Sequence, residues 1–166
     1  MKHSTIILLC ILIGLLLTAC AGGENPPPTA NTNIKVAPLS DTAYKAAITP
    51  VSPPATLHAG EQASLHVKVK NIGDGPWPAQ GQGPKYKVDL GNHWFDKKGV
   101  TEVLGDDGRV GLPHDLKPGE EVELVLPVKA PKTPGDYTIV LDMVHEDLTW
   151  FALRGSQTAK INVTVQ

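Results

Sequence analysis

Hydrophobic and polar residues alternate with a period of two in three segments of the chain, 63–70, 121–129 and 159–165. Successive side chains of a β-strand point to opposite faces, so each segment is expected to bury one face and leave the other in water. The apolar positions are Ala63, Leu65, Val67 and Val69, then Val122, Leu124, Leu126 and Val128, and finally Ala159, Ile161, Val163 and Val165. The segment 137–144 is nearly continuously apolar, which predicts a central strand buried on both sides.

Turn-forming residues separate these segments and define the expected fold class. Clusters of Gly, Pro, Asp and Lys occur at 73–76, 97–99, 105–108, 117–119 and 133–135. No segment after residue 20 has a helical period. About seven short strands in about 120 residues predict a single all-β domain, a β-sandwich of antiparallel strands.

One turn makes the expected topology more specific. Pro134-Gly135-Asp136-Tyr137 precedes the apolar strand 138–141. A tyrosine that enters the penultimate strand and returns its hydroxyl to the backbone is a tyrosine corner, a feature of immunoglobulin-like (Ig-like) sandwiches. Ile139 then occupies the position of the second cysteine of antibody domains, with Leu65 or Val67 opposite. Apolar packing is expected to replace the disulfide.

The N-terminus predicts export. Met1, Lys2 and His3 form a short basic region, and residues 6–17 are almost purely apolar. This run is shorter than the roughly 20 residues of a membrane-spanning helix and fits the core of a signal peptide. Leu17-Thr18-Ala19-Cys20 resembles the lipobox of bacterial lipoproteins. An uncleaved membrane anchor and a plain secretory signal are the alternatives.

The lipobox resemblance implies an organisation in three parts. Residues 1–19 are expected to be a lipoprotein signal peptide, and 20–42 the lipidated Cys20 followed by a flexible tether rich in Gly, Pro, Asn and Thr. Residues 43–166 are expected to form the Ig-like domain. A diacylglycerol on the Cys20 sulfur and a further acyl chain such as palmitate would hold the protein stably on a membrane. We expect the domain to face the periplasm or the exterior from the cell membrane or, in a Gram-negative host, the outer membrane.

Cysteine usage and charge exclude several function classes. Cys10 leaves with the signal peptide and Cys20 is acylated, so the mature domain has no thiol for catalysis, thiolate metal binding or redox chemistry. The formal net charge of −2 gives no support for a nucleic-acid partner. We expect no cofactor besides the lipid on Cys20.

Candidate metal and catalytic groups do not form a known constellation in the sequence. His93, His114 and His145 lack the close spacing of metal-ligand pairs, so we expect no metal site. The adjacent carboxylates at 106–107, 120–121 and 146–147 are expected to be solvated turns. A nucleophile-elbow motif is absent, and we expect no enzyme.

Aromatic residues are the remaining candidates for ligand binding. Trp77, Trp94, Trp150 and Phe151 could stack on sugar rings, or they could pack in the core, because tryptophan buries a large apolar area. The candidate binding residues are Trp77, His93, Trp94 and Trp150.

Six segments, in order, also carry a family resemblance. They match the patterns N-x-G-x-x-x-W-P at 71–78, H-W-x-D at 93–96, R-x-x-L-P at 109–113, x-P-G-E at 117–120, A-P-x-x-P-G-x-Y at 130–137 and D-x-V-x-E-x-x-x-W-F at 142–151. Together they resemble bacterial Ig-like accessory domains found beside glycosyltransferases and in other surface proteins. Those domains are similar to the four-tryptophan Ig-like domain of a eukaryotic autophagy cargo receptor. This chain has three Trp.

The resemblance implies an Ig-like fold and an accessory or binding role. Two function classes follow. The first is a membrane-anchored, non-catalytic envelope lipoprotein whose Ig-like domain is a structural or protein-binding module. The second is a glycan-binding module that uses surface aromatics. Burial or exposure of the Trp side chains distinguishes the two classes.

Overall fold

The computed structural model describes residues 38–105 and 107–166. The expected signal peptide, Cys20 and most of the expected tether lie outside the described residues. The elements are β1 (Ala46–Val51), β2 (Thr56–Leu57), β3 (Gln62–Asn71), β4 (Val88–Asp96), β5 (Glu102–Leu104), β6 (Arg109–Gly111), β7 (Glu121–Lys129), β8 (Gly135–His145), β9 (Thr149–Trp150), the 3₁₀ helix η1 (Phe151–Arg154) and β10 (Ala159–Val165). The described part is all-β apart from η1, which at four residues is too short to leave a helical period in the sequence.

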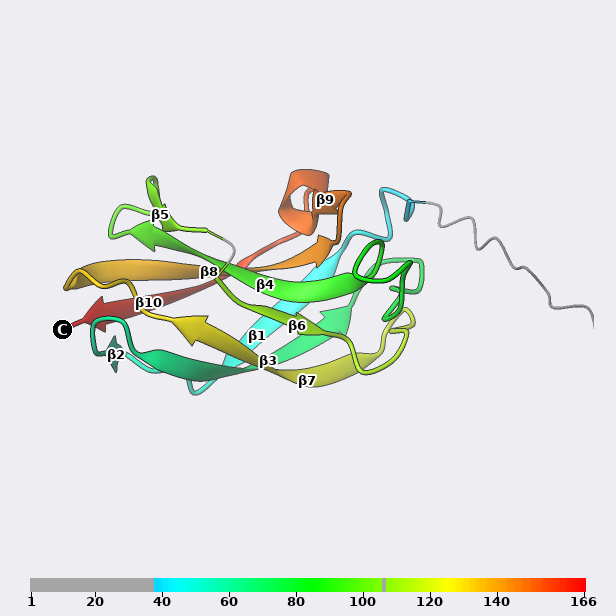
Figure 1. The fold of residues 1–166 in the computed structure, drawn as a ribbon. Coiled ribbons are helices and arrows are strands. Elements are labelled where there is room, and N and C mark those ends of the chain that lie inside the picture. Colours follow the sequence, from blue (N-terminus) through cyan, green and yellow to red (C-terminus); the bar gives the residue numbers. More distant parts are fainter. Residues whose placement is uncertain (1–37, 106) are drawn as a thin grey trace, which may run out of the picture. The chain divides into compact units, whose positions relative to one another are not determined.

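Two sheets form the sandwich (Figure 1). One sheet has the order β1-β3-β7, and the other has the order β2-β10-β8-β4-β5, with β6 also paired to β4 and β9 to β8. Neighbouring strands are antiparallel except β2, which runs parallel to β10. The first, second and fifth long strands of an Ig domain share one sheet in the same way, opposite the sheet of its last two strands. The domain is therefore an Ig-like β-sandwich, as the sequence predicted.

The alternating segments supply the core, as expected. Leu65 and Val67 of β3 pair with Leu126 and Leu124 of β7, and these four side chains are buried together with Val69 and Val128. Ile161, Val163 and Val165 of β10 are buried as well.

At the centre of the core, aliphatic side chains occupy the positions that the disulfide cysteines have in antibody domains. Ile139 of β8 lies opposite Trp94 of β4, and Leu65 and Val67 are buried in the same core cluster. A buried Trp on the equivalent strand packs against the disulfide of antibody domains. Here Trp94 keeps that place while aliphatic side chains fill the position of the cysteines.

The tyrosine corner predicted at Tyr137 is confirmed. The Tyr137 hydroxyl donates a hydrogen bond of 2.8 Å to the carbonyl oxygen of Thr133, in the turn that precedes β8. The Tyr137 ring packs edge-on against Trp94, with ring centroids 6.2 Å apart. The hydrogen bond joins the turn to the start of the strand, and the ring joins both to the core.

Strand β8 is buried on both sides, because the chain after it folds back over the outer face of its sheet. Leu141 and Met143 point into the sandwich, whereas Asp142 and Val144 point outward and are nonetheless buried. Strand β9 pairs with the end of β8, and η1 follows directly. These two short elements provide the cover that positions the candidate site.

The packed part of the domain includes residues before the boundary expected at residue 43. Leu39 packs against the core, and Ser40 Oγ donates a 3.1 Å hydrogen bond to Asp74. Ala43 and Tyr44 are buried. The described residues 38–105 and 107–166 belong to one compact unit.

Candidate functional site

Two of the tryptophans considered as ligand platforms are core residues. Trp77 and Trp94 are each 0% exposed. The Trp77 indole donates to the Ala43 carbonyl oxygen at 2.8 Å, and the Trp94 indole donates to Asp107 Oδ2 at 3.3 Å. Neither ring presents a face to solvent, so neither contributes to a surface site.

The other two candidates, His93 and Trp150, come together on the outer face of the larger sheet. His93 points outward from β4 and Trp150 lies in β9, and their ring centroids are 4.3 Å apart. Both side chains are partly exposed. The fold brings together residues far apart in the sequence because β4 and β9 both pair with β8, and the Trp150 side chain reaches over β8 to His93.

Gly91 in β4 makes room for a cation–π contact between Arg109 and Trp150. The guanidinium of Arg109, from β6, lies over the Trp150 ring at 4.4 Å from the centroid. A Cβ at Gly91 would lie 2.2 Å from the Arg109 guanidinium and 2.9 Å from the Trp150 ring. Gly91 is therefore needed for the two side chains to occupy the surface of β4.

Arg109 also pairs with Glu146, which corrects one expectation. Arg109 Nε donates to Glu146 Oε1 at 3.0 Å, and the Glu146 side chain is only 23% exposed. Glu146 was expected in a solvated turn. The turn after β8 instead folds onto the sheet, and burial raises the pKa of Glu146 while Arg109 opposes that rise. Next to it, buried Asp89 forms an ion pair with Lys87 at 2.7 Å.

Asp142 attaches η1 to the sheet. Its Oδ1 accepts the Met143 N–H at 2.8 Å, and its Oδ2 accepts the Ala152 N–H of η1 at 3.0 Å. The side chain is 3% exposed, and this burial raises the pKa of Asp142 to about 6, although both backbone donors favour the ionised form. Both carboxylate oxygens hold backbone groups in place.

A small groove opens beside these residues. It has a volume of about 230 Å³. Its apolar walls are Phe95 of β4, Val140 of β8, Trp150 of β9 and Ala152 and Leu153 of η1. His93, Glu102, Asp142 and Thr158 supply its polar lining. Leu153 is 76% exposed, so the groove has an unusually accessible apolar wall.

A hydrogen bond between His93 and Glu102 fixes one end of the groove. His93 Nδ1 lies 2.7 Å from Glu102 Oε1, and the Glu102 side chain is 44% exposed. Phe95, Glu102, Asp142 and Leu153 were not among the residues selected from the sequence. Asp142 gave a usable signal, because a carboxylate within an apolar run requires partners. Leu153 gave none.

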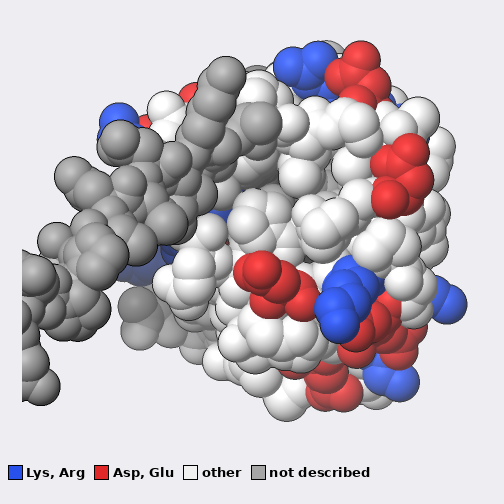
Figure 2. Space-filling view, turned by 90° about the vertical axis from the view of Figure 1, so that its right-hand side faces the viewer, with Lys and Arg blue, Asp and Glu red and all other residues white. Residues whose placement is uncertain are grey.

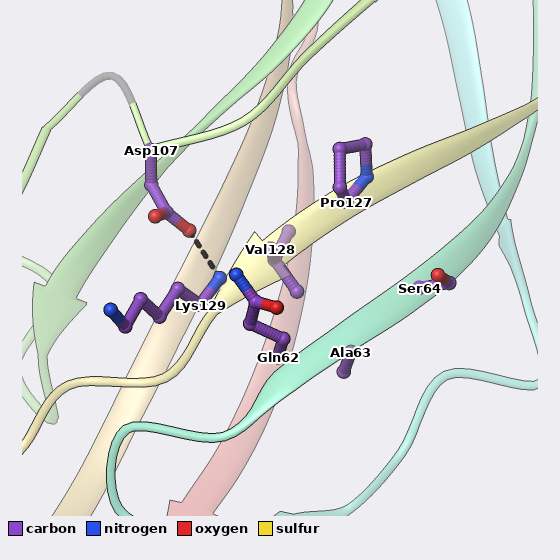
Figure 3. Close-up of a pocket in the computed structure, with 7 residues that line it drawn as sticks. All are labelled: Gln62, Ala63, Ser64, Asp107, Pro127, Val128 and Lys129. Carbon is purple, nitrogen blue, oxygen red and sulfur yellow. Dashed lines mark hydrogen bonds between the residues drawn. The ribbon is translucent and has the colours of Figure 1, made fainter.

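A second hollow lies at an edge between the sheets and is more polar. Gln62 and Ser64 of β3, Pro127 and Lys129 of β7, and Asp107 line it, with a volume of about 450 Å³ (Figure 3). Asp107 Oδ2 accepts the backbone N–H of Lys129 at 2.6 Å, the contact dashed in Figure 3. Since Asp107 also accepts from Trp94, its carboxylate serves to close the edge of the sandwich.

The remaining histidines are separate from one another. His145 is fully buried, with Nδ1 2.9 Å from the Tyr44 hydroxyl and Nε2 3.2 Å from the Tyr86 carbonyl oxygen, and desolvation lowers its pKa. His66 pairs with Glu123 at 3.2 Å on the other sheet. Within residues 38–105 and 107–166, no three His, Cys, Asp or Glu side chains gather as metal ligands would.

The motif residues largely serve to build the fold. The Asn71 amide donates to the carbonyl oxygens of Gly75 and Leu116, at 2.9 and 2.8 Å. Asp96 accepts the N–H groups of Val100 and Thr101 in the turn after β4. Phe151 packs edge-on against Trp77. The part of the groove most open to a partner, at Phe95 and Leu153, lies at positions that the motifs leave variable or outside them.

Comparison with known proteins gives similarities of fold. No protein-family model and no curated protein sequence matches this chain. Solved structures that are similar include a CARDB domain from Pyrococcus furiosus in complex with di-metal ions, with 19% identity, a TM-score of 0.41, and coverage of 73% of this chain and 90% of that one. A β-glucosidase from Listeria innocua has 18% identity and a TM-score of 0.44, with 73% and 16% covered. The sporulation control protein Spo0M from Bacillus subtilis has 16% identity and a TM-score of 0.43, with 74% and 49% covered.

At these identities and TM-scores the similarities say nothing about a ligand or an activity of this chain. The protein class that the described residues define is an Ig-like β-sandwich, with an apolar groove on the outer face of its larger sheet. In the described part of the chain, no helix is long and apolar enough to cross a membrane.

Proposed function

We propose that this protein is a membrane-anchored, non-catalytic envelope lipoprotein whose Ig-like domain is a structural or protein-binding module. The observation that supports it most is the groove beside η1, with Leu153 76% exposed on one wall and Phe95 and Trp150 on the others. Exposed aliphatic and aromatic side chains beside a shallow depression are typical of protein contact sites.

The roles of the perturbed ionisable groups support a non-catalytic module. Asp142 and His145 are buried groups whose pKa values are shifted by desolvation. Asp142 uses both oxygens to hold backbone N–H groups, and His145 lies between Tyr44 and the Tyr86 carbonyl group. Each is committed to a structural contact, whereas a general acid or base needs access to a substrate proton.

The anchor part of the proposal rests on the N-terminal sequence. Lipidation of Cys20 would place at least two acyl chains in a membrane, which gives stable attachment. A tether of about 22 residues spans roughly 25 Å as a flexible coil. The domain would then be displayed close to the membrane, toward the periplasm or the exterior. On the face that Figure 2 shows, acidic and basic side chains lie among one another, which suits a protein partner better than a polyanion.

Photo-crosslinking in cells tests the proposal. Benzoylphenylalanine at Leu153 in the full chain is expected to form a discrete adduct with an envelope protein. The matched control is the same residue at Val125, which is 48% exposed on β7 of the other sheet. Adduct formation at Leu153 alone supports the proposal. Equal adducts at both positions, or none at Leu153, would overturn it.

A glycan-binding module is the second candidate. Phe95, His93 and Trp150 follow one another along the outer face of β4, as an aromatic surface for sugar rings would. Against this, the Trp150 ring already contacts both His93 and the Arg109 guanidinium. Retention of the full chain on isolated cell-wall polysaccharide, lost in Trp150→Ala, would favour the glycan function over the protein-binding one.

A further inference from the structure

The charges around the groove indicate what kind of side chain it accepts. Among the described residues that line it, the charged ones are the carboxylates Glu102 and Asp142, and none is Lys or Arg. His93 is the one lining residue that could add positive charge, and it is already paired with Glu102 at 2.7 Å. The lining therefore has a net negative formal charge whether His93 is neutral or protonated.

The apolar walls add a second requirement. Phe95, Val140, Trp150 and Leu153 offer carbon surface, so an occupant made only of a charged group would leave them in water. Lys and Arg side chains combine an aliphatic stem with a cationic tip, and they cover apolar surface with the stem while the tip reaches polar groups. A cation near the Phe95 ring also gains a cation–π interaction, whereas the Trp150 ring already holds the Arg109 guanidinium at 4.4 Å.

The two carboxylates are not equally available to such a tip. Glu102 is 44% exposed at the groove, which allows it to meet a cation without a conformational change. Asp142 lies deeper and is 3% exposed, so it acts through its charge across the groove rather than through solvent-accessible oxygen. Desolvation has raised the pKa of Asp142 to about 6, and a nearby cation would offset that cost.

We propose that the groove between β4, β8 and η1 binds a lysine or arginine side chain of a partner protein, with the aliphatic stem on Phe95, Trp150 and Leu153 and the cation at Glu102. This inference rests on the protein-binding function proposed above and specifies the chemistry of the partner. The groove volume of about 230 Å³ suits one long side chain rather than a larger ligand.

Calorimetric titration of the detergent-solubilised full chain tests this chemistry. The probes are three capped tripeptides in which lysine, norleucine or glutamate lies between two leucines. Norleucine keeps the aliphatic stem without the charge, and glutamate reverses the charge. We expect the lysine peptide to bind about fivefold more tightly than the norleucine peptide, which corresponds to about 1 kcal/mol for a partly exposed ion pair. The glutamate peptide should bind weakest.

The structure provides a matched control for the charge. Glu102→Gln should abolish the preference for lysine over norleucine and leave norleucine binding unchanged. Glu123→Gln removes a carboxylate that also pairs with a histidine, His66 at 3.2 Å, but lies on the other sheet, so the preference should remain. Equal binding of lysine and norleucine by the unmodified protein, loss of the preference in both variants, or no binding of any peptide would overturn the inference.

The two proposals can fail separately. Crosslinking at Leu153 depends on proximity to a partner and not on the partner's charge. An adduct at Leu153 combined with equal binding of the lysine and norleucine peptides would leave the protein-binding function standing and exclude the cationic side chain.

Discussion

Replacing Asp142 with asparagine is expected to remove a defined part of the pH dependence of folding. Burial raises the pKa of Asp142 from 3.8 to about 6 in the folded protein. The folded state therefore holds this proton more tightly than the unfolded chain. Below pH 3.8 the contribution to stability is fully present, and the free energy of unfolding falls as pH rises through about 6.

The magnitude follows from the shift. About two pKa units at 1.36 kcal/mol each correspond to about 3 kcal/mol between pH 4 and pH 7. Asparagine has no such titration. Its amide NH₂ would face one of the two backbone N–H donors, from Met143 and Ala152, which costs about 1–3 kcal/mol at every pH. The test is therefore the slope against pH and not the stability at one pH.

Urea unfolding of residues 35–166, followed by far-ultraviolet circular dichroism at pH 4, 5, 6 and 7, measures this slope. The difference in free energy of unfolding between wild type and Asp142→Asn should change by about 3 kcal/mol across the range, with the wild type relatively most stable at pH 4. Asp136→Asn is the control. Lys97 and Thr164 lower the pKa of Asp136 below 3.8, so its difference curve should be nearly flat from pH 4 to pH 7 and should slope in the opposite direction only at lower pH. A flat difference curve for Asp142→Asn would refute the conclusion that burial raises the pKa of the Asp142 carboxyl group.

Three further outcomes are expected. Tyr137→Phe loses the hydrogen bond to Thr133 and should lower the free energy of unfolding, measured in urea, by about 0.5–1.5 kcal/mol. Tyr137→Ala also loses the ring and should lower it by about 3–5 kcal/mol. A Tyr137→Ala protein as stable as wild type would contradict the tyrosine corner. Gly91→Ala displaces Arg109 and Trp150 and should cost about 1–3 kcal/mol in the same assay, whereas unchanged stability would show that the stack is not tightly packed. Cys20→Ala should abolish labelling by a palmitate analogue in cells, and equal labelling of mutant and wild type would disprove the lipid anchor.

The candidate site was only partly predictable. The sequence suggests Trp150 as a residue that could stack on a sugar ring and His93 as a neighbouring polar group, and the fold brings their ring centroids within 4.3 Å of each other. Trp77 and Trp94 have the same chemistry but are buried, because they point into the sandwich. Residue type therefore selected the four candidates, and the direction of each side chain separated them.

Glu146 and Leu153 illustrate why the other residues of the site could not be predicted from the sequence. Glu146 looked like a solvated turn residue, yet it forms a half-buried pair with Arg109 from a strand 37 positions earlier. Leu153 lies in a four-residue 3₁₀ helix, which is too short to show a period. Both depend on how the segment between β8 and β10 folds, and its sequence contains no repeating pattern.

The sequence by itself determined the inward faces of β3, β7 and β10 and the tyrosine corner at Tyr137. These features are local, because alternation with period two and a turn followed by Tyr act over a few neighbouring residues. Only the tertiary structure decided that β9 and η1 cover the outer face of β8, that Gly91 admits Arg109 and Trp150, and that a groove remains beside Leu153. Those outcomes arise from packing between segments far apart in the chain, where shape and burial select the arrangement rather than any local pattern.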